Sequence, residues 1–204
     1  RKTPTDVLEP RARRVLELLE GNSAFRILDI GCSDGAFTVK FKEALGAKEA
    51  WGIDISSEAV ENAKAKGVNA LKVNLEDGLL PVPSAHFEYV FCLEIIEHLF
   101  NTDGLLREIH RILTPTGKAI FTTPNLSWWV SRLILLLGYQ PYHSEVSMVY
   151  NVGKYKSEAN IQPGGHLRLF THRALKELLK LHGFAVVGDY GLKSTALPWY
   201  LKAL

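Results

Sequence analysis

Two periodicities in the distribution of apolar residues divide the chain into predicted strands and helices. Short runs of β-branched and aromatic residues, each bounded by glycine or polar residues, predict buried strands. Segments whose apolar residues recur three and four positions apart predict amphipathic helices between them. The predicted strands are 26–30, 50–56, 68–73, 87–93, 118–123 and 184–190, and the predicted helices are 11–20, 36–45, 57–66, 102–113 and 172–183.

The order of these elements predicts the fold class. Strands and helices alternate from residue 26 onward. Such a β-α-β-α-β order predicts an α/β fold, in which a parallel sheet with right-handed crossovers carries helices on both faces. A chain of 204 residues suits one such domain, and 47% hydrophobic residues are enough for a substantial core. We therefore predict a single domain over residues 1–204.

One stretch of the chain does not fit this alternation. Residues 126–137 carry two adjacent tryptophans and a run of leucine and isoleucine, which Arg132 interrupts and which is too short to span a bilayer. Such a run fits a core crossover helix, a lid over an apolar substrate, or an anchor in a membrane interface. Residues 138–165 show no clear periodicity and contain several tyrosines. We predict that residues 126–170 form a lid that binds the substrate.

Net charge and cysteine content exclude several classes of protein. A net charge of +2 is too small to indicate a nucleic-acid surface, so we expect no nucleic-acid partner. Cys32 and Cys92 do not form a C-x-x-C pair, so neither a disulfide framework nor a zinc knuckle is expected. We expect no signal peptide, and no run of about 18 apolar residues occurs in the sequence. We expect a cytoplasmic protein without a transmembrane segment, with peripheral membrane contact left open.

The turn after the first predicted strand carries the clearest chemical signal. Gly31 and Gly35 bracket a tight turn in which a Cβ atom would block the approach of a ligand. The helix that begins there points its free N–H groups toward the ends of the strands. Asp29 and Asp34 add negative charge, which disfavours a phosphate and favours a ligand with a positive centre or free donors. An ordinary strand-to-helix turn without a ligand is the alternative.

The common phosphate-binding motifs do not fit this turn. A P-loop requires Lys and then Ser or Thr after its second glycine, whereas Ala36 and Phe37 follow here. A dinucleotide fingerprint requires the spacing G-x-G-x-x-G, and Ser33 breaks it. The second strand reaches Asp54, an acid that can accept hydrogen bonds from both hydroxyls of a ribose at this place in a doubly wound sheet.

The sequence DIGCSDG at residues 29–35, together with Asp54, resembles the class I S-adenosylmethionine-dependent methyltransferases. The resemblance extends from about residue 25 to about residue 188 and is nearest to the small-molecule branch of types 11, 12 and 23. That branch includes ubiquinone-type and methionine-biosynthesis W-type enzymes. The resemblance implies a Rossmann-like, seven-stranded and mostly parallel sheet, whose last strand would be antiparallel and lie within residues 191–204.

The resemblance also implies S-adenosylmethionine as the cofactor and assigns its parts to segments. The glycine turn would hold the methionine part, Asp54 the ribose and residues 74–75 the adenine, while the end of the fourth strand would border the sulfonium and methyl group. Ser33 and Asn74 stand where the family often has Gly and Asp, and Asn74 could instead only form a turn with Asp77. The predicted cofactor residues are Asp29, Gly31, Cys32, Ser33, Gly35, Asp54, Ile55, Asn74, Leu75, Cys92 and Leu93.

The sequence E-x-x-E-H at residues 94–98 follows the fourth strand. On a helix, Glu94, Glu97 and His98 would share one face, where they could hold a divalent metal. The motif resembles a metal-assisted branch of the family that includes quinone-ring and small-RNA 2′-O-methyltransferases. There a later histidine completes the site, and His166 stands in a similar setting here. The motif is also widespread in methyltransferases that bind no metal, in which His98 would contact the substrate or act as a general base.

The predicted function is methyl transfer from S-adenosylmethionine to a small molecule. His98 and His166 are the predicted catalytic residues, because they could lower the pKa of an acceptor hydroxyl. The tryptophans and tyrosines of the predicted lid favour an acceptor with an aromatic or lipid-like hydroxyl. Two alternatives are a nicotinamide dehydrogenase, which the missing third glycine opposes, and a non-catalytic binding or adaptor protein that keeps the cofactor pocket.

Overall fold

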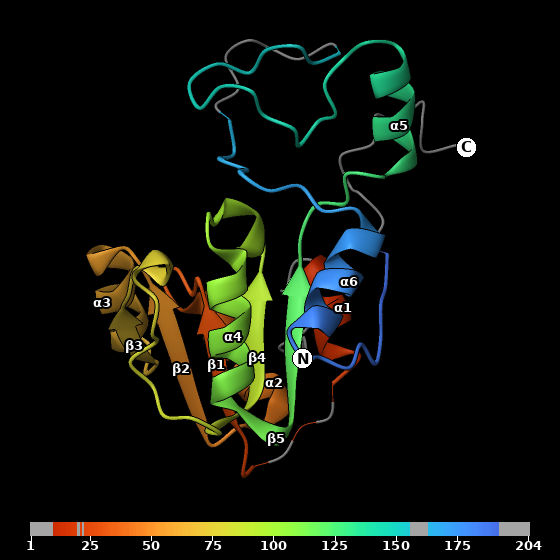
Figure 1. Ribbon diagram of the computed structural model, residues 1–204. Coiled ribbons are helices and arrows are strands. Elements are labelled where there is room, and N and C mark those ends of the chain that lie inside the picture. Colours follow the sequence, from red (N-terminus) through yellow and green to blue (C-terminus); the bar gives the residue numbers. More distant parts are fainter. Residues whose placement is uncertain (1–9, 20, 22, 156–162, 192–204) are drawn as a thin grey trace, which may run out of the picture.

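A computed structural model of the chain describes residues 10–19, 21, 23–155 and 163–191. At its centre lies a sheet of five parallel strands in the order β3-β2-β1-β4-β5 (Figure 1). The direction of strand addition reverses between β1 and β4, and open α/β sheets bind their ligands at such a switch point. The strands are β1 (Arg26–Ile30), β2 (Glu49–Asp54), β3 (Asn69–Lys72), β4 (Phe87–Leu93) and β5 (Leu113–Thr122).

Helices cover both faces of the sheet. Two apolar clusters on opposite faces join α1 and α2 to β1 and β4 on one side, and α4 and α6 to the same strands on the other. A third cluster packs α3 beside β3. The helices are α1 (Pro10–Leu16), α2 (Ala36–Leu45), α3 (Ser57–Ala65), α4 (Thr102–Ile112), α5 (Trp129–Leu136) and α6 (His172–Leu181).

The sequence of β1 shows how these layers arise. Successive side chains of a strand point to opposite faces, so Ile27 packs among α1 and α2 while Leu28 and Ile30 pack toward α4. All three side chains are fully buried, as expected for a central parallel strand with helices on both faces. The predicted α/β fold with a parallel sheet is therefore confirmed.

The predicted number of strands is wrong for the described part of the chain. The sheet there has five strands, because residues 184–190 form no ladder with β5. Phe184 and Val186 pack against the core beside α4, whereas the next residue, Val187, is exposed. The alternation of apolar residues that predicted a strand thus reflects one-sided packing of an irregular segment. The predicted seventh strand falls on residues 192–204, outside the described residues.

The chain between β5 and α6 forms a second layer above the carboxyl ends of the strands (Figure 1). This upper layer consists of residues 126–155 and 163–169 and includes α5. It leaves and rejoins the sheet side by side, because Asn125 and Phe170 form a β-bridge. The core-helix interpretation of residues 126–137 is wrong, because α5 stands clear of the sheet and Leu133, Leu135 and Leu136 are exposed. That the upper layer acts as a lid stays a prediction.

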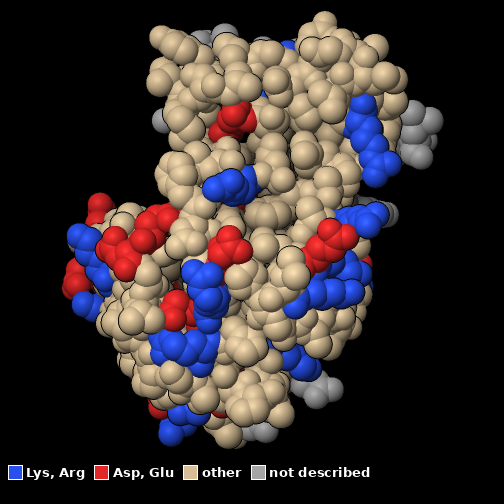
Figure 2. All heavy atoms as spheres, viewed as in Figure 1, with Lys and Arg blue, Asp and Glu red and all other residues tan. Residues whose placement is uncertain are grey.

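Charged and uncharged residues are distributed unevenly between the two layers. Lysine, arginine, aspartate and glutamate side chains gather over the sheet layer, whereas the visible face of the upper layer carries few of them (Figure 2). Among the described residues, no helix has both the length and the apolar character needed to cross a membrane.

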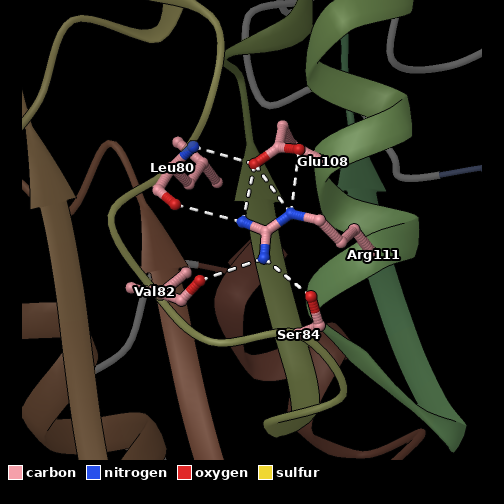
Figure 3. Close-up of polar contacts among 5 residues, drawn as sticks. All are labelled: Leu80, Val82, Ser84, Glu108 and Arg111. Carbon is pink, nitrogen blue, oxygen red and sulfur yellow. Dashed lines mark hydrogen bonds and ion pairs between the residues drawn. The ribbon is translucent and has the colours of Figure 1, made fainter.

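Arg111 of α4 fixes the loop that precedes β4 (Figure 3). Its guanidinium donates hydrogen bonds to the carbonyl oxygens of Leu80 and Val82, at 3.0 and 3.1 Å, and to Oγ of Ser84 at 3.0 Å. It also pairs with Glu108 at 2.7 Å, and the Glu108 carboxylate accepts the N–H of Leu80 at 2.8 Å. The hydrogen bond from Arg111 holds the pKa of Glu108 below its usual range. Both residues therefore stabilise the loop as an ion pair.

Candidate functional site

The glycine turn connects β1 to α2 beside the end of β2. The N–H groups of Gly31 and Cys32 both donate to the carbonyl oxygen of Ile53, at 2.7 and 3.0 Å. Gly31 has a φ of 78°, and a Cβ atom there would lie 2.1 Å from Cδ1 of Ile95. Gly35, the N-cap of α2, has a φ of 74°. Both glycines are therefore required by backbone conformation and by close neighbours, Ile95 at Gly31 and Ala63 at Gly35.

Asp29 lies beneath this turn and faces the interior. Its carboxylate is buried and accepts a hydrogen bond from Oγ1 of Thr38 on α2 at 2.6 Å. Burial raises the pKa of Asp29 to about 7, although the hydrogen bond from Thr38 opposes this. Asp29 is thus placed to tie β1 to α2, and the structure directs its carboxylate to Thr38 rather than to an open surface.

Asp54, the last residue of β2, joins the glycine turn to the start of α3. Its Oδ2 accepts the N–H of Ser33 and its Oδ1 accepts the N–H of Ser56, each at 2.9 Å. The next residue, Ile55, exposes 64% of its surface and offers an apolar contact beside these polar groups. The structure therefore brings the turn, Asp54 and Ile55 together, as the sequence predicts.

Asn74 follows β3 at the same edge of the sheet. Its side chain caps the short helix η2 (Leu75–Asp77) by accepting the N–H of Glu76 at 3.2 Å, and it donates to Asp77 at 2.9 Å. This is the turn that the sequence offers as the alternative to an adenine contact. The backbone N–H of Val73 bonds to the carbonyl of Asp54 at 2.9 Å, so residues 74–75 lie next to the Asp54 region in any case.

The end of β4 borders the turn on its other side. Cys92 pairs in register with Ile30, is fully buried, and has a pKa raised above its ordinary value by burial. Burial also raises the pKa of Cys32 to about 12. Both thiols therefore stay protonated near neutral pH and behave as small apolar groups.

Residues 94–98 do not form a helix on which Glu94, Glu97 and His98 would share a face. Glu94 has a left-handed backbone with a φ of 56°, and its N–H donates to the carbonyl and the hydroxyl of Thr122, at 3.0 and 3.1 Å. Only the single 3₁₀ turn η3 (Ile96–His98) follows. Glu94, Glu97 and His98 consequently do not share one α-helical face, because the chain turns sharply at Glu94.

A different group of three residues comes together at η3. Glu97, His98 and His166 each place a possible ligand atom within 4.8 Å of the others. The rings of His98 and His166 stack with their centroids 5.1 Å apart. Glu97 is fully buried, which raises its pKa, and neither of its carboxylate oxygens has a hydrogen-bond partner among the described residues. The predicted pairing of His98 with His166 is therefore seen in the structure, and Glu94 is not part of this group.

Backbone contacts hold this group in place. The N–H groups of Leu167 and Arg168 donate to the carbonyl of Glu97, at 2.8 and 2.9 Å. Nδ1 of His98 lies 3.0 Å from the carbonyl oxygen of Gly165. Because a carbonyl oxygen can only accept, this Nδ1 carries a proton, and Nε2 of a neutral His98 then keeps its lone pair. The contact with Gly165 therefore fixes the tautomer of a neutral His98.

Two positioning residues were missed by sequence reasoning. Glu145 accepts the N–H groups of residues 164–166 at 2.6–3.0 Å and lies 3.5 Å from Nδ1 of His166. Although burial alone would raise its pKa, these N–H groups hold the pKa of Glu145 below its ordinary value. Ile95 lies between the group at η3 and the glycine turn, which it contacts at Gly31. No local pattern marks Glu145, but the apolar pair 95–96 inside the E-x-x-E-H motif does indicate packing.

Comparisons with known proteins agree with this geometry. A family described as methyltransferase domain matches residues 6–188. The ubiquinone biosynthesis O-methyltransferase of Vibrio atlanticus is 24% identical over 174 residues, which are 82% of this chain and 70% of that protein. The 27-O-demethylrifamycin SV methyltransferase of Amycolatopsis mediterranei is 30% identical over 124 residues, which are 54% of this chain and 44% of that protein.

The fold is also that of solved methyltransferases. The structure of an S-adenosylmethionine-dependent methyltransferase from Archaeoglobus fulgidus matches with a TM-score of 0.61 at 17% identity, over 97% of this chain and 82% of that one. The chain spans between 43% and 70% of the length of the curated relatives it matches. With a family match over most of its length, the chain belongs to the class I S-adenosylmethionine-dependent methyltransferases.

Proposed function

We propose that this protein transfers the methyl group of S-adenosylmethionine to a small molecule that carries an aromatic or lipid-like hydroxyl. The observation that carries the proposal is the pair of stacked imidazoles, His98 and His166, beside a buried carboxylate and next to the glycine turn. Two relatives are named as methyltransferases, one an O-methyltransferase of ubiquinone biosynthesis and one acting on 27-O-demethylrifamycin SV. Both names favour a hydroxyl acceptor.

The residues at the carboxyl ends of β1, β2 and β3 would hold the cofactor. The glycine turn at residues 29–35 would hold the methionine part, and Asp54 keeps lone pairs for the ribose hydroxyls after accepting two backbone N–H groups. Ile55 and residues 74–75 offer the adenine an apolar contact and an amide. Cys92 and Leu93 would border the sulfonium. The cofactor supplies the methyl group and a neutral leaving group when it is bound.

His98 would remove the proton of the acceptor hydroxyl. Its Nδ1 is held by the carbonyl of Gly165, so its Nε2 is the nitrogen that can take a proton. The proton of the acceptor hydroxyl would pass to this Nε2 when the acceptor oxygen is methylated. His166 stacks on the ring of His98 and restricts its orientation, which favours the in-line arrangement that this reaction needs.

The same group of residues also fits a divalent cation. The donor set of one carboxylate and two imidazoles is typical of small divalent metals, and the unpartnered oxygens of Glu97 are available as ligands. Glu97, His98 and His166 would hold such an ion, without the Glu94 of the first prediction. A metal there would supply electrostatic stabilisation of the acceptor oxygen. Calorimetric titration of Mn²⁺ into the wild type and into Glu97→Gln tests this, because binding that Glu97→Gln leaves unchanged would exclude the site.

Titration calorimetry with S-adenosylmethionine and S-adenosylhomocysteine tests the cofactor assignment. Asp54→Ala should weaken both affinities by about tenfold or more, because the two charge-assisted hydrogen bonds from the ribose hydroxyls to the carboxylate would be lost. Asp103→Ala, which removes an exposed carboxylate on α4, is the matched control and should change neither affinity. An Asp54→Ala affinity within about threefold of the wild type would contradict the assignment.

Turnover assays with a panel of acceptors test the proposed reaction. His98→Gln should keep cofactor affinity but lower kcat by about a hundredfold or more, whereas His172→Gln on α6 should change neither. Methylation of aromatic or long-chain hydroxyls would support the acceptor class. Methylation of polar metabolites or proteins alone would contradict it, and cofactor binding without turnover would favour the non-catalytic alternative.

A further inference from the structure

The upper layer presents large apolar side chains to solvent. Leu136, Leu137 and Val149 expose 82%, 68% and 69% of their surfaces. Large exposed apolar side chains gathered on one part of a soluble protein commonly contact a partner or a membrane. The apolar face, as we call it, comprises the exposed side chains of residues 129–155, chiefly Trp129, Leu133, Leu136, Leu137, Val149 and Tyr150.

The acidic residue and the lysine of this segment turn inward. Between residues 129 and 155 the charged residues are Arg132, Glu145 and Lys154. Glu145 accepts the backbone N–H groups of residues 164–166. Nζ of Lys154 donates to the carbonyl oxygens of Pro141 and Tyr142, at 2.6 and 2.7 Å, and to that of Ser144. The usual placement of charged and apolar side chains is thus reversed. Two charged side chains bond to backbone groups within the upper layer, while leucine and valine side chains are exposed to solvent.

Helix α5 has the composition of a helix that lies in a membrane interface. Val130, Ser131 and Ile134 are buried on its inner side, and Trp129 and Leu133 are exposed on its outer side. Arg132 is exposed on the same helix and donates through Nε to the carbonyl of Ser127 at 2.7 Å. Apolar and aromatic residues around a basic side chain, without an exposed acid, complement an anionic lipid surface.

We propose that the apolar face docks on the surface of an anionic lipid bilayer, with α5 and residues 146–150 inserted among the headgroups. The exposed tyrosines and Trp129 suit this depth, because their rings combine an apolar body with a polar end. Glu97, His98 and His166 lie where the upper layer meets the sheet. The docking itself does not depend on the proposed reaction.

Cosedimentation of the full chain with lipid vesicles tests the docking. The wild type should bind phosphatidylcholine vesicles that contain about a quarter phosphatidylglycerol more strongly than vesicles of phosphatidylcholine alone. Leu136→Asp should lower the partition coefficient by about tenfold or more, because it removes a leucine that inserts into the bilayer and adds a negative charge. Leu181→Asp on α6 is the matched control, because Leu181 is 85% exposed and lies outside the apolar face.

Equal loss of binding in both leucine variants, or no binding of the wild type, would overturn the proposal. Sedimentation equilibrium without lipid tests the alternative that the apolar face binds a second copy of this chain. A dimer that Leu136→Asp dissociates, with no wild-type binding to vesicles, would assign the face to self-association instead. Arg132→Gln should abolish the preference for phosphatidylglycerol while leaving part of the binding, and an unchanged preference would contradict the role given to Arg132.

Discussion

Replacing Asp29 by asparagine should remove much of the pH dependence of stability between about pH 4 and about pH 7. Burial beneath the glycine turn raises the pKa of this carboxyl from 3.8 to about 7 in the folded protein, and the charge of Asp54 acts in the same direction. The unfolded chain exposes the carboxyl, which then ionises near its ordinary pKa. The unfolded state therefore loses its proton at a lower pH than the folded state does.

The sign and size of the effect follow from this difference. Stabilisation of the folded state by the bound proton is fully present below about pH 4 and is lost as the pH rises through about 7. A pKa difference of about 3 corresponds to a loss of about 4 kcal/mol in the free energy of unfolding, which is an upper value for a real denatured state. The amide of the Asp29→Asn variant has no proton to lose, and its oxygen can still accept the hydrogen bond from Thr38.

Urea unfolding at several pH values, for the wild type and Asp29→Asn, measures this contribution. The two unfolding free energies should diverge as the pH rises, with the Asp29→Asn variant the more stable at about pH 8. In Thr38→Val the free energy of unfolding should decline at higher pH than in the wild type, because the hydrogen bond from Thr38 lowers the pKa of Asp29. Glu58→Gln, an exposed change on α3, serves as the control. Parallel curves for the wild type and Asp29→Asn would refute the reasoning.

Two further changes test the backbone and the loop. Gly31→Ala should destabilise the fold by about 2 kcal/mol or more, since it combines a left-handed backbone with a clash against Ile95, whereas Gly46→Ala has the same backbone cost but open space around it. Equal melting temperatures for the two variants would argue against a tight turn. Arg111→Met should cost about 2 kcal/mol in urea unfolding, because Glu108 and two loop carbonyls lose their donor. Arg173→Met removes an exposed ion pair with Glu177 and should change the urea midpoint little. An equal effect of both arginine variants would count against the stabilisation of the loop by Arg111.

Local sequence patterns predicted the sheet layer well. The apolar runs identified all five strands of the observed sheet, and Ser56 and Thr171 cap α3 and α6. The closeness of Asp54 to the glycine turn followed from parallel pairing, because parallel strands place their carboxyl ends at one edge. These features depend on contacts within a few residues or between neighbouring strands.

The features that sequence reasoning missed depend on longer-range geometry. The left-handed backbone of Glu94 is imposed by hydrogen bonds to Thr122 on β5, and no propensity of Glu predicts it. Residues 184–190 alternate like a strand but find no ladder in the described part of the chain. The contact between His98 and His166 was expected from resemblance alone, because the spacing of the two residues does not indicate it.

The bridge between Asn125 and Phe170 has a consequence for how this protein could change over evolutionary time. Because the two ends of the intervening segment are neighbours, its length and sequence can vary without moving β5 or α6. Recombination or insertion at these two positions would exchange the upper layer while leaving the glycine turn intact. The same pair of positions offers protein engineers a defined place to graft the corresponding segment of another methyltransferase onto this sheet.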